Sequence, residues 1–332
     1  MDFLNDMLQP QVYPEDTATV VCLQTYISYI FLTDRHAYKI KKPVNFGYLD
    51  FSTLRKRHYF LEQELVLNRR LAPDMYLAVL PLVRHHGRLR LGGVGPPLEY
   101  ALQMVRLPQH LMMDEIAARR ELRAEMVARI VARLVPFYQQ AATGRRIRKF
   151  GHASVIHYNH QENFQQLQPF VGSLLSKSAF HDMVYSADHF MKEHAELLAD
   201  RLRTGKIRDC HGDLHMKNIC LADGIYIFDC IEFNARFRYS DVAADVAFLA
   251  MDLDFYGYPD LSRFFGQTFA AQSGDPDILR LLGFYKSYRA VVRGKINALA
   301  STGPGLPQAE RDKAAALARR YFDLAWRYSQ EP

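Results

Sequence analysis

Cysteine and long hydrophobic runs are scarce in this chain of 332 residues. It has 4 cysteines, and no two of them form a C-x₂-C pair, which argues against a zinc site. Buried free thiols in a reducing compartment are the simpler interpretation. No segment approaches the roughly 18 consecutive apolar residues of a membrane span. The N-terminal segment is acidic where a signal peptide needs a basic start. We therefore expect a cytoplasmic protein without a membrane partner.

Basic residues are in small excess over acidic ones. The 42 lysines and arginines and the 36 acidic residues give a net charge of +6. The basic residues fall in short runs, which are typical of solvated faces and helix ends, so we do not expect nucleic acid as a partner. A phosphate-bearing substrate or a nucleotide could use the same excess. The length allows two lobes with cores of their own.

The predicted elements change in kind near residue 105. Residues 19–42 are rich in β-branched and aromatic side chains and predict a hairpin about the polar break at 33–36. Residues 52–71 predict an amphipathic helix with Ser52 as N-cap, and strands follow at 76–84 and 99–105. Beyond Pro108 the pattern predicts a β stretch at 210–229 and helices at 114–142, 178–204, 240–251, 276–300 and 309–329.

This order of elements predicts an α+β, bilobal architecture. Residues 1–105 would form a small β-rich N-lobe with one helix. Residues 106–332 would form a larger helical C-lobe. A ligand site is expected in the cleft between two such lobes.

The segment from His211 to Asn218 reads HGDLHMKN, and the apolar stretch GIYIFD follows it and ends at Asp229. An acid, an amide five residues later and a second acid after a strand is the layout of a kinase catalytic loop. Asp213 would accept the proton of a substrate hydroxyl, while Asn218 and Asp229 would hold Mg²⁺ on the nucleotide phosphates. Carboxylate and amide oxygens are the hard ligands that Mg²⁺ prefers.

These motifs resemble the aminoglycoside phosphotransferase and choline kinase superfamily. The D-x-x-E element from Asp229 to Glu232 also resembles that group, as does the later pair Asp241 and Asp245. The pieces AYKIKKPVNFGYLDFSTLRKR and LEQELVLNRRLAPDMY resemble an uncharacterised bacterial branch. The resemblance runs over about residues 20–300 and implies a protein-kinase-like fold. It also implies transfer of the γ-phosphoryl group of ATP to a small-molecule hydroxyl, with Asp245 bracing the catalytic loop.

A kinase N-lobe needs a lysine for the α- and β-phosphates and a helix glutamate that pairs with it. The sequence AYKI resembles the V-A-I-K pattern and favours Lys39. Lys41 lies on the same strand face and is the alternative. Glu64 fits the helix partner, and Glu62 is its alternative.

The rest of the nucleotide site carries a weaker signal, because the G-x-G-x-x-G motif is missing and the first hairpin reads YISYI. Ser28 and nearby backbone N–H groups would then cover the phosphates. Residues 99–105 would connect the lobes and bind adenine. Met104 would pack against the base, or else belong to the core.

Three basic residues fall on one predicted helix of the C-lobe. Lys286, Arg289 and Arg293 lie at i, i+3 and i+7, on one face of a helix. The resemblance puts such a helix beside the acceptor, so one hypothesis is an acceptor whose carboxylate or phosphate binds Arg289 or Arg293. The alternative is that these cations form ion pairs with nearby acidic residues: Asp252, Asp254 and Asp260.

Other functions stay open. A catalytically silent nucleotide-binding or scaffold protein could share the fold. A metal-dependent hydrolase could use His211, Asp213 and His215 with Asp229 as ligands, although a hydrolase gives no reason for Asn218. A protein kinase would need a D-F-G…A-P-E segment, which does not follow Asp229.

Overall fold

The computed structural model describes residues 3–303 and 306–330. The chain forms two compact units, Met1–Ile116 with Lys217–Ala235, and Ala117–Met216 with Arg236–Pro332. The first unit is therefore discontinuous in sequence. It extends past residue 105 and takes in the segment that carries Asn218 and Asp229, which the two-lobe prediction assigned to the second part of the chain.

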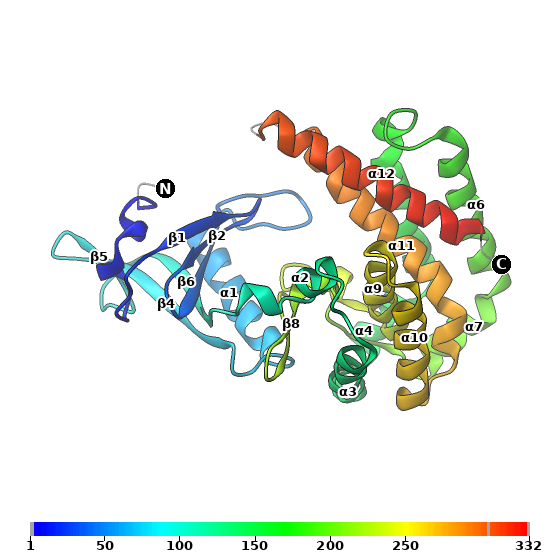
Figure 1. Ribbon diagram of the computed structural model, residues 1–332, viewed down its shortest axis with the longest axis horizontal. Coiled ribbons are helices and arrows are strands. Elements are labelled where there is room, and N and C mark those ends of the chain that lie inside the picture. The colour runs from blue at the N-terminus through cyan, green and yellow to red at the C-terminus, as the bar shows by residue number, and fades with distance from the viewer. Residues whose placement is uncertain (1–2, 304–305, 331–332) are drawn as a thin grey trace. The chain divides into compact units, whose positions relative to one another are not determined.

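The first unit is built on a six-stranded sheet with the order β1-β2-β3-β6-β4-β5 (Figure 1), in which every neighbouring pair is antiparallel. The strands are β1 (Val21–Gln24), β2 (Ser28–Leu32), β3 (His36–Lys41), β4 (Tyr76–His85), β5 (Arg88–Leu91) and β6 (Pro97–Val105). A separate hairpin pairs β8 (Ile219–Leu221) with β9 (Ile225–Ile227).

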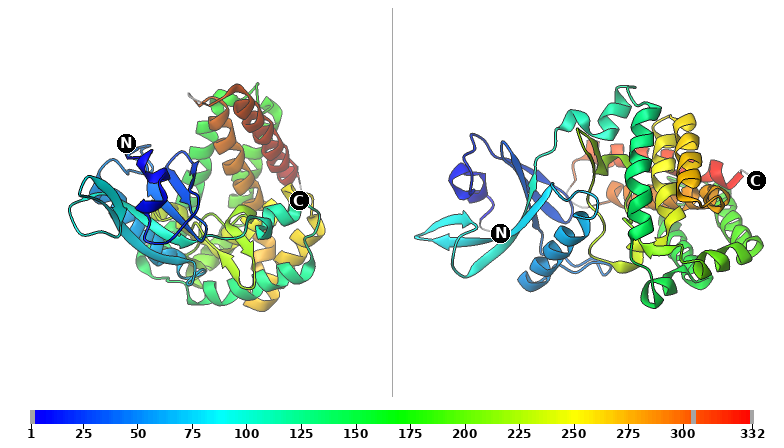
Figure 2. Two further views of the ribbon diagram at one scale, coloured as in Figure 1. Left: turned by 60° about the vertical axis from the view of Figure 1, so that its left-hand side comes forward. Right: turned by 90° about the horizontal axis from the view of Figure 1, so that it is seen from below.

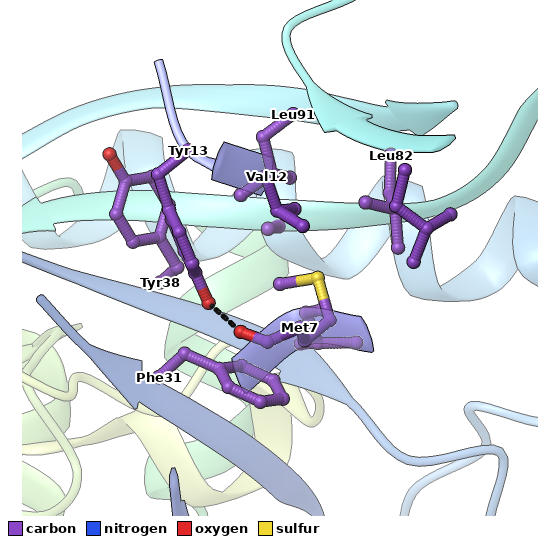
Figure 3. Packing of buried hydrophobic residues seen from close by; sticks show 10 residues of the cluster. Met7, Val12, Tyr13, Phe31, Tyr38, Leu82 and Leu91 are labelled. Carbon is purple, nitrogen blue, oxygen red and sulfur yellow. Dashed lines mark hydrogen bonds between the residues drawn. The ribbon is translucent and has the colours of Figure 1, made fainter. Parts of the chain in front are cut away.

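Two hydrophobic clusters hold the six-stranded sheet. One contains Leu61 and Leu65 of helix α1 (Leu54–Asn68) together with Tyr76, Leu102 and Met104. The other joins the sheet to the N-terminal segment, whose short 3₁₀ turns Asp6–Leu8 and Pro10–Val12 bring in further apolar side chains (Figure 3): Met7, Val12 and Tyr13. The Tyr13 hydroxyl donates to the Met7 carbonyl at 2.7 Å, which fixes this segment on itself.

The second unit is mainly helical, and its helix α10 packs against both α3 and α9 (Figure 2), while α11 packs against α9 and α12 (Figure 1). Its elements are α3 (Ala124–Gln140), α4 (Arg145–Arg148), α5 (Ala153–Leu167), α6 (Lys177–Glu193), α7 (Ala195–Arg203), β7 (Ile207–Asp209), β10 (Tyr239–Asp241), α9 (Val242–Phe255), α10 (Pro259–Ser273), α11 (Asp277–Ser301) and α12 (Gln308–Gln330). Two short helices, α2 (Met113–Ala118) and α8 (Ala235–Arg238), lie where the chain passes between units. Within the described ranges, no helix combines the length and the apolar character needed to cross a lipid bilayer.

Several local expectations needed correction. Residues 19–42 form three strands, because the Thr25 hydroxyl accepts the N–H groups of Ile27 and Ser28 and closes an extra turn. The N-cap of α1 is Thr53, which accepts the Lys56 N–H, and not Ser52. The long helices expected at 114–142 and 178–204 are each divided in two, and α5 and α10 were not predicted.

Candidate active site

Two lysines of β3 converge on one glutamate of α1. Strand alternation turns Lys39 and Lys41 to the same side. The Lys39 Nζ lies 2.7 Å from Glu64 Oε1, and the Lys41 Nζ lies 2.7 Å from Glu64 Oε2. Each lysine also binds a second acid, Asp229 at 2.8 Å from Lys39 and Glu232 at 2.5 Å from Lys41. The lysine–glutamate pairing expected for Lys39 and Glu64 is present, and Glu62 lies outside it, beside His58.

The two acids that bind Lys39 differ in solvent exposure. The side chain of Glu64 is 0% exposed, whereas that of Asp229 is 46% exposed. Burial would raise the pKa of Glu64, but the Lys39 and Lys41 ammonium groups outweigh it and lower that pKa to about 2. Burial raises the pKa of Glu232 despite its contact with Lys41. Glu64 is therefore a fixed internal anion, and Asp229 is the carboxylate that a ligand can reach.

The backbone at Asp229 is held in an unusual conformation. Its φ of 61° lies in the left-handed region, which few residues other than glycine adopt and which aspartate tolerates. The Tyr76 hydroxyl accepts the Asp229 N–H at 3.1 Å, and the Asn68 side chain accepts the Cys230 N–H at 2.8 Å. The Asn68 amide also donates to the Glu64 carbonyl at 2.8 Å. These bonds tie the Asp229 segment to the helix that carries Glu64.

Sequence reasoning missed this role of Asn68. Its position four residues after Glu64 was a usable signal, because two polar residues at i and i+4 share one helix face. Asn68 is 1% exposed, so this polar side chain is buried where the apolar stripe of α1 would otherwise continue.

Asn218 and Asp229 lie at the same end of the β8–β9 hairpin. The Asn218 carbonyl accepts the Phe228 N–H at 3.0 Å, one residue before Asp229. Their amide and carboxylate oxygens fit the preferences of Mg²⁺. Among the residues that the structure describes, no three or more His, Cys, Asp or Glu side chains form a group that could hold a metal ion.

Asp213 lies in the second unit, in the loop that follows β7. Its side chain is 32% exposed, and its carboxylate lies 3.3 Å from the His215 Nε2. The Asp213 N–H donates to the ring of the fully buried His211 at 3.2 Å. Burial would raise the pKa of Asp213, but His215, Arg293 and His211 hold it well below its usual range. Asp213 is thus an ionised, partly exposed carboxylate.

The loop is braced by Asp245 of α9, as expected from the resemblance. Its carboxylate accepts the N–H groups of His211 at 2.6 Å and of Gly212 at 3.0 Å. A second brace was not anticipated, since Asp252 accepts the Met216 N–H at 2.9 Å. Backbone donors of the loop that carries Asp213 are therefore satisfied by buried carboxylates on one helix.

Arg289 belongs to this brace and not to an acceptor site. It is 6% exposed, and its three nitrogens donate to Ala244 O at 3.0 Å, Gly212 O at 3.2 Å and Asp245 Oδ1 at 3.2 Å. The predicted bidentate contact with an acceptor is not compatible with these bonds, because the guanidinium is buried and each of its three nitrogens already donates to a protein oxygen. We assign Arg289 to positioning the loop.

The other two cations on this face of α11 differ from each other. Lys286 pairs with Asp254 at 2.8 Å, as the alternative interpretation of the basic face predicts. Arg293 lies over the Tyr321 ring, 5.7 Å from its centroid. Its Nε is buried and has no hydrogen-bond partner among the described residues. Arg293 therefore stays a candidate for binding an anionic acceptor.

Two predicted nucleotide contacts do not have the expected environment. Ser28 is fully buried, so its side chain is not exposed to a phosphate. The predicted lobe connection at 99–105 is part of β6, which pairs with both β3 and β4. Met104 is 6% exposed and belongs to the core cluster, which was the alternative interpretation.

The structure has the protein-kinase-like fold that the sequence predicts. The same fold occurs in a choline/ethanolamine kinase family protein from Mesorhizobium loti, which is 13% identical and matches with a TM-score of 0.51 over 95% of this chain and 93% of that chain. A glucosamine kinase solved with glucosamine, ADP and inorganic phosphate is 15% identical and matches with a TM-score of 0.50, over 91% of this chain and 75% of that chain. This is the fold of the superfamily that the catalytic-loop motif resembles.

The sequence itself is similar to an uncharacterized protein of Mycobacterium tuberculosis strain H37Rv. The two are 33% identical over 296 residues, which is 89% of this chain and 57% of the relative. The chain thus spans little more than half the length of the curated relatives that it matches. No family model matches the chain.

Proposed function

We propose that the chain is an ATP- and Mg²⁺-dependent phosphotransferase that moves the γ-phosphoryl group to a hydroxyl of a small molecule. The observation that carries this proposal is the Lys39 ammonium, which binds both Glu64 and Asp229. In the kinase mechanism this lysine holds the α- and β-phosphates, and the acid that ends the strand binds the metal. The ADP in the glucosamine kinase of the same fold agrees with nucleotide use.

In this proposal Lys39 donates to the nucleotide phosphates, and Glu64 keeps its ammonium in place. Asn218 and Asp229 would hold Mg²⁺, which when bound neutralises the phosphate charge. Partly buried apolar side chains of the first unit, among them Ile30, Leu107 and Phe228, pack against the cluster that contains Met104. They offer an apolar surface suited to an adenine ring.

Asp213 would orient the acceptor hydroxyl and accept its proton as the new bond to phosphorus forms. Its low pKa keeps it ionised at neutral pH, so it acts mainly by accepting a hydrogen bond and positioning the oxygen. Arg293 adds positive charge beside Asp213 and would bind an acceptor that carries a carboxylate or phosphate. The glucosamine and choline or ethanolamine named for the neighbours are, by contrast, amino or ammonium compounds.

A metal-dependent hydrolase that uses His211 and His215 fits the structure less well. The ring of His211 accepts the Asp213 N–H and is fully buried. The ring of His215 lies against Asp213 and is 7% exposed in its side chain. Both histidines therefore support the loop from within.

The test is phosphorylation of a metabolite pool with labelled ATP and Mg²⁺, followed by mass spectrometry of the labelled product. Asp213→Asn should bind ATP as the parent protein does and lose turnover by roughly 10²-fold or more. Asp229→Ala should also weaken binding of Mg·ATP. If both variants bind ATP normally and the parent protein labels no product, the silent nucleotide-binding protein is correct. Equal turnover by Asp213→Asn and the parent would remove Asp213 from the mechanism.

A further inference from the structure

Charged and amide side chains gather where α5, α8 and α11 meet in the second unit. The Lys295 Nζ of α11 donates to Asn163 Oδ1 at 2.6 Å and to Gln166 Oε1 at 2.8 Å. On the neighbouring side of α5, Arg236 of α8 donates to Glu162 Oε2 at 2.6 Å and contacts Asn159. The proposed mechanism uses no residue of this cluster.

The charges of this cluster do not balance. It holds the two cations Arg236 and Lys295 and one carboxylate, Glu162, which is engaged by Arg236. Over residues 3–303 and 306–330, no carboxylate lies within 4.0 Å of the Lys295 Nζ, whereas Lys286 on the same helix has Asp254. Lys295 therefore has amide oxygens around it but no counterion in contact.

Burial has a measurable consequence for Lys295. Loss of hydration lowers the pKa of its ammonium group to about 8; Glu162 of α5 opposes this shift and Arg236 of α8 adds to it. An anion placed against the ammonium group would reverse the shift, because an opposite charge favours the protonated form.

The cluster is connected to the loop that carries Asp213 through two of its elements. The carbonyl of Arg238, two residues after Arg236, accepts the Cys210 N–H at 3.1 Å, three residues before Asp213. On α11, Arg289 donates to the Gly212 carbonyl, and Lys295 follows Arg293 by two residues. Successive residues rise about 1.5 Å along a helix, so Lys295 lies about 3 Å beyond Arg293 along the axis of α11, and its side chain leaves the helix on a different side.

We infer that Lys295, with Arg236 beside it, forms a binding site for a carboxylate or phosphate group. The anion site stands on the contacts and charges of the cluster. Asn163, which is 4% exposed, fixes the ammonium group from the protein side, so that a ligand anion would complete its coordination.

The test follows the Lys295 ammonium directly, in the full chain labelled with ¹⁵N-lysine. Its NMR signal is assigned by its absence in Lys295→Met, and it is titrated with pH alone and with glycerol 3-phosphate, glycerate or uncharged glycerol. Without anion the group should titrate near pH 8, and either anion should raise that midpoint by about half a unit or more. Lys295→Met should raise the half-saturating concentration of glycerol 3-phosphate, followed on neighbouring backbone signals, by roughly 10- to 100-fold.

Two variants serve as controls. Lys295→Arg keeps the charge and should retain anion binding without the titration near pH 8. Lys313→Met removes an exposed lysine of α12 and should change neither measurement. A Lys295 midpoint that no anion moves would overturn the inference, even if the chain proves to be a kinase. Anion binding at Lys295 in a chain that consumes no ATP would instead remove the proposed function and leave the anion site standing.

Discussion

Replacing Arg289 with alanine should destabilise the second unit by about 3–5 kcal/mol, the usual cost of removing one partner from a buried ion pair. The substitution would leave the Asp245 carboxylate, which is 0% exposed, without its cation. It would also leave the carbonyls of Ala244 and Gly212 without the donors they have now. With about 3 kcal/mol per M as the urea dependence, the unfolding midpoint should fall by roughly 1–2 M.

The assay is urea unfolding followed by circular dichroism, with two companion variants. Arg289→Lys keeps the charge but loses the planar fork that reaches three acceptors, so it should show an intermediate loss. Arg280→Ala removes an exposed arginine of the same helix, paired with Asp277, and should cost less than about 1 kcal/mol. Equal midpoints for Arg289→Ala and Arg280→Ala would refute the assignment of Arg289 to the brace.

Two other perturbations test the first unit. Lys39→Ala should lower kcat/KM for Mg·ATP by more than about tenfold. Lys41→Ala leaves Glu232 buried without its lysine and should mainly lower the urea midpoint. Steady-state kinetics and urea unfolding of both variants check this, and the reverse pattern would make Lys41 the phosphate lysine. Glu15 accepts a hydrogen bond from Thr33 at 2.7 Å and contacts His36. Burial raises the pKa of Glu15, but these contacts outweigh burial, so the folded pKa is below the unfolded value of about 4.3. The stabilisation from ionised Glu15 is therefore complete above the unfolded pKa and is lost as pH falls through the folded pKa. Urea midpoints between pH 6 and pH 3 should fall less in Glu15→Gln than in the parent or in the exposed control Glu62→Gln, and three equal slopes would contradict the assignment.

The sequence was most informative where local geometry dictates the outcome. Strand alternation alone puts Lys39 and Lys41 on one side of β3. Helix spacing left Glu62 and Glu64 both open as their partner, and the resemblance favoured Glu64. The order of Asp213, Asn218 and Asp229 along the chain indicated the kinase-like fold, because such a loop and hairpin need those residues in that order. Their roles in catalysis stay predictions.

Tertiary contacts decided what the sequence could not. The spacing of Lys286, Arg289 and Arg293 predicts one helix face, but it does not say whether that face meets solvent, a ligand or buried acids. In the structure each of the three has different surroundings. Arg289 is buried, and it donates hydrogen bonds to the carbonyl of Gly212 and the carboxylate of Asp245. Ser28 illustrates the same limit, since its side chain was expected to cover the nucleotide phosphates and is fully buried.

The charges around Glu64 bear on how Mg·ATP would bind under the proposed function. The lysines Lys39 and Lys41 face the three acids Glu64, Asp229 and Glu232, so the group carries one negative charge in excess when all are ionised. Triphosphate alone would add like charge, and Lys39 would have to leave Asp229 to reach it. A divalent cation held by Asp229 would offset both effects, since it would take the place of the lysine on the carboxylate and neutralise part of the phosphate charge. ATP without Mg²⁺ should therefore bind much more weakly than Mg·ATP, and Asp229→Asn should reduce that difference, because the excess negative charge is removed.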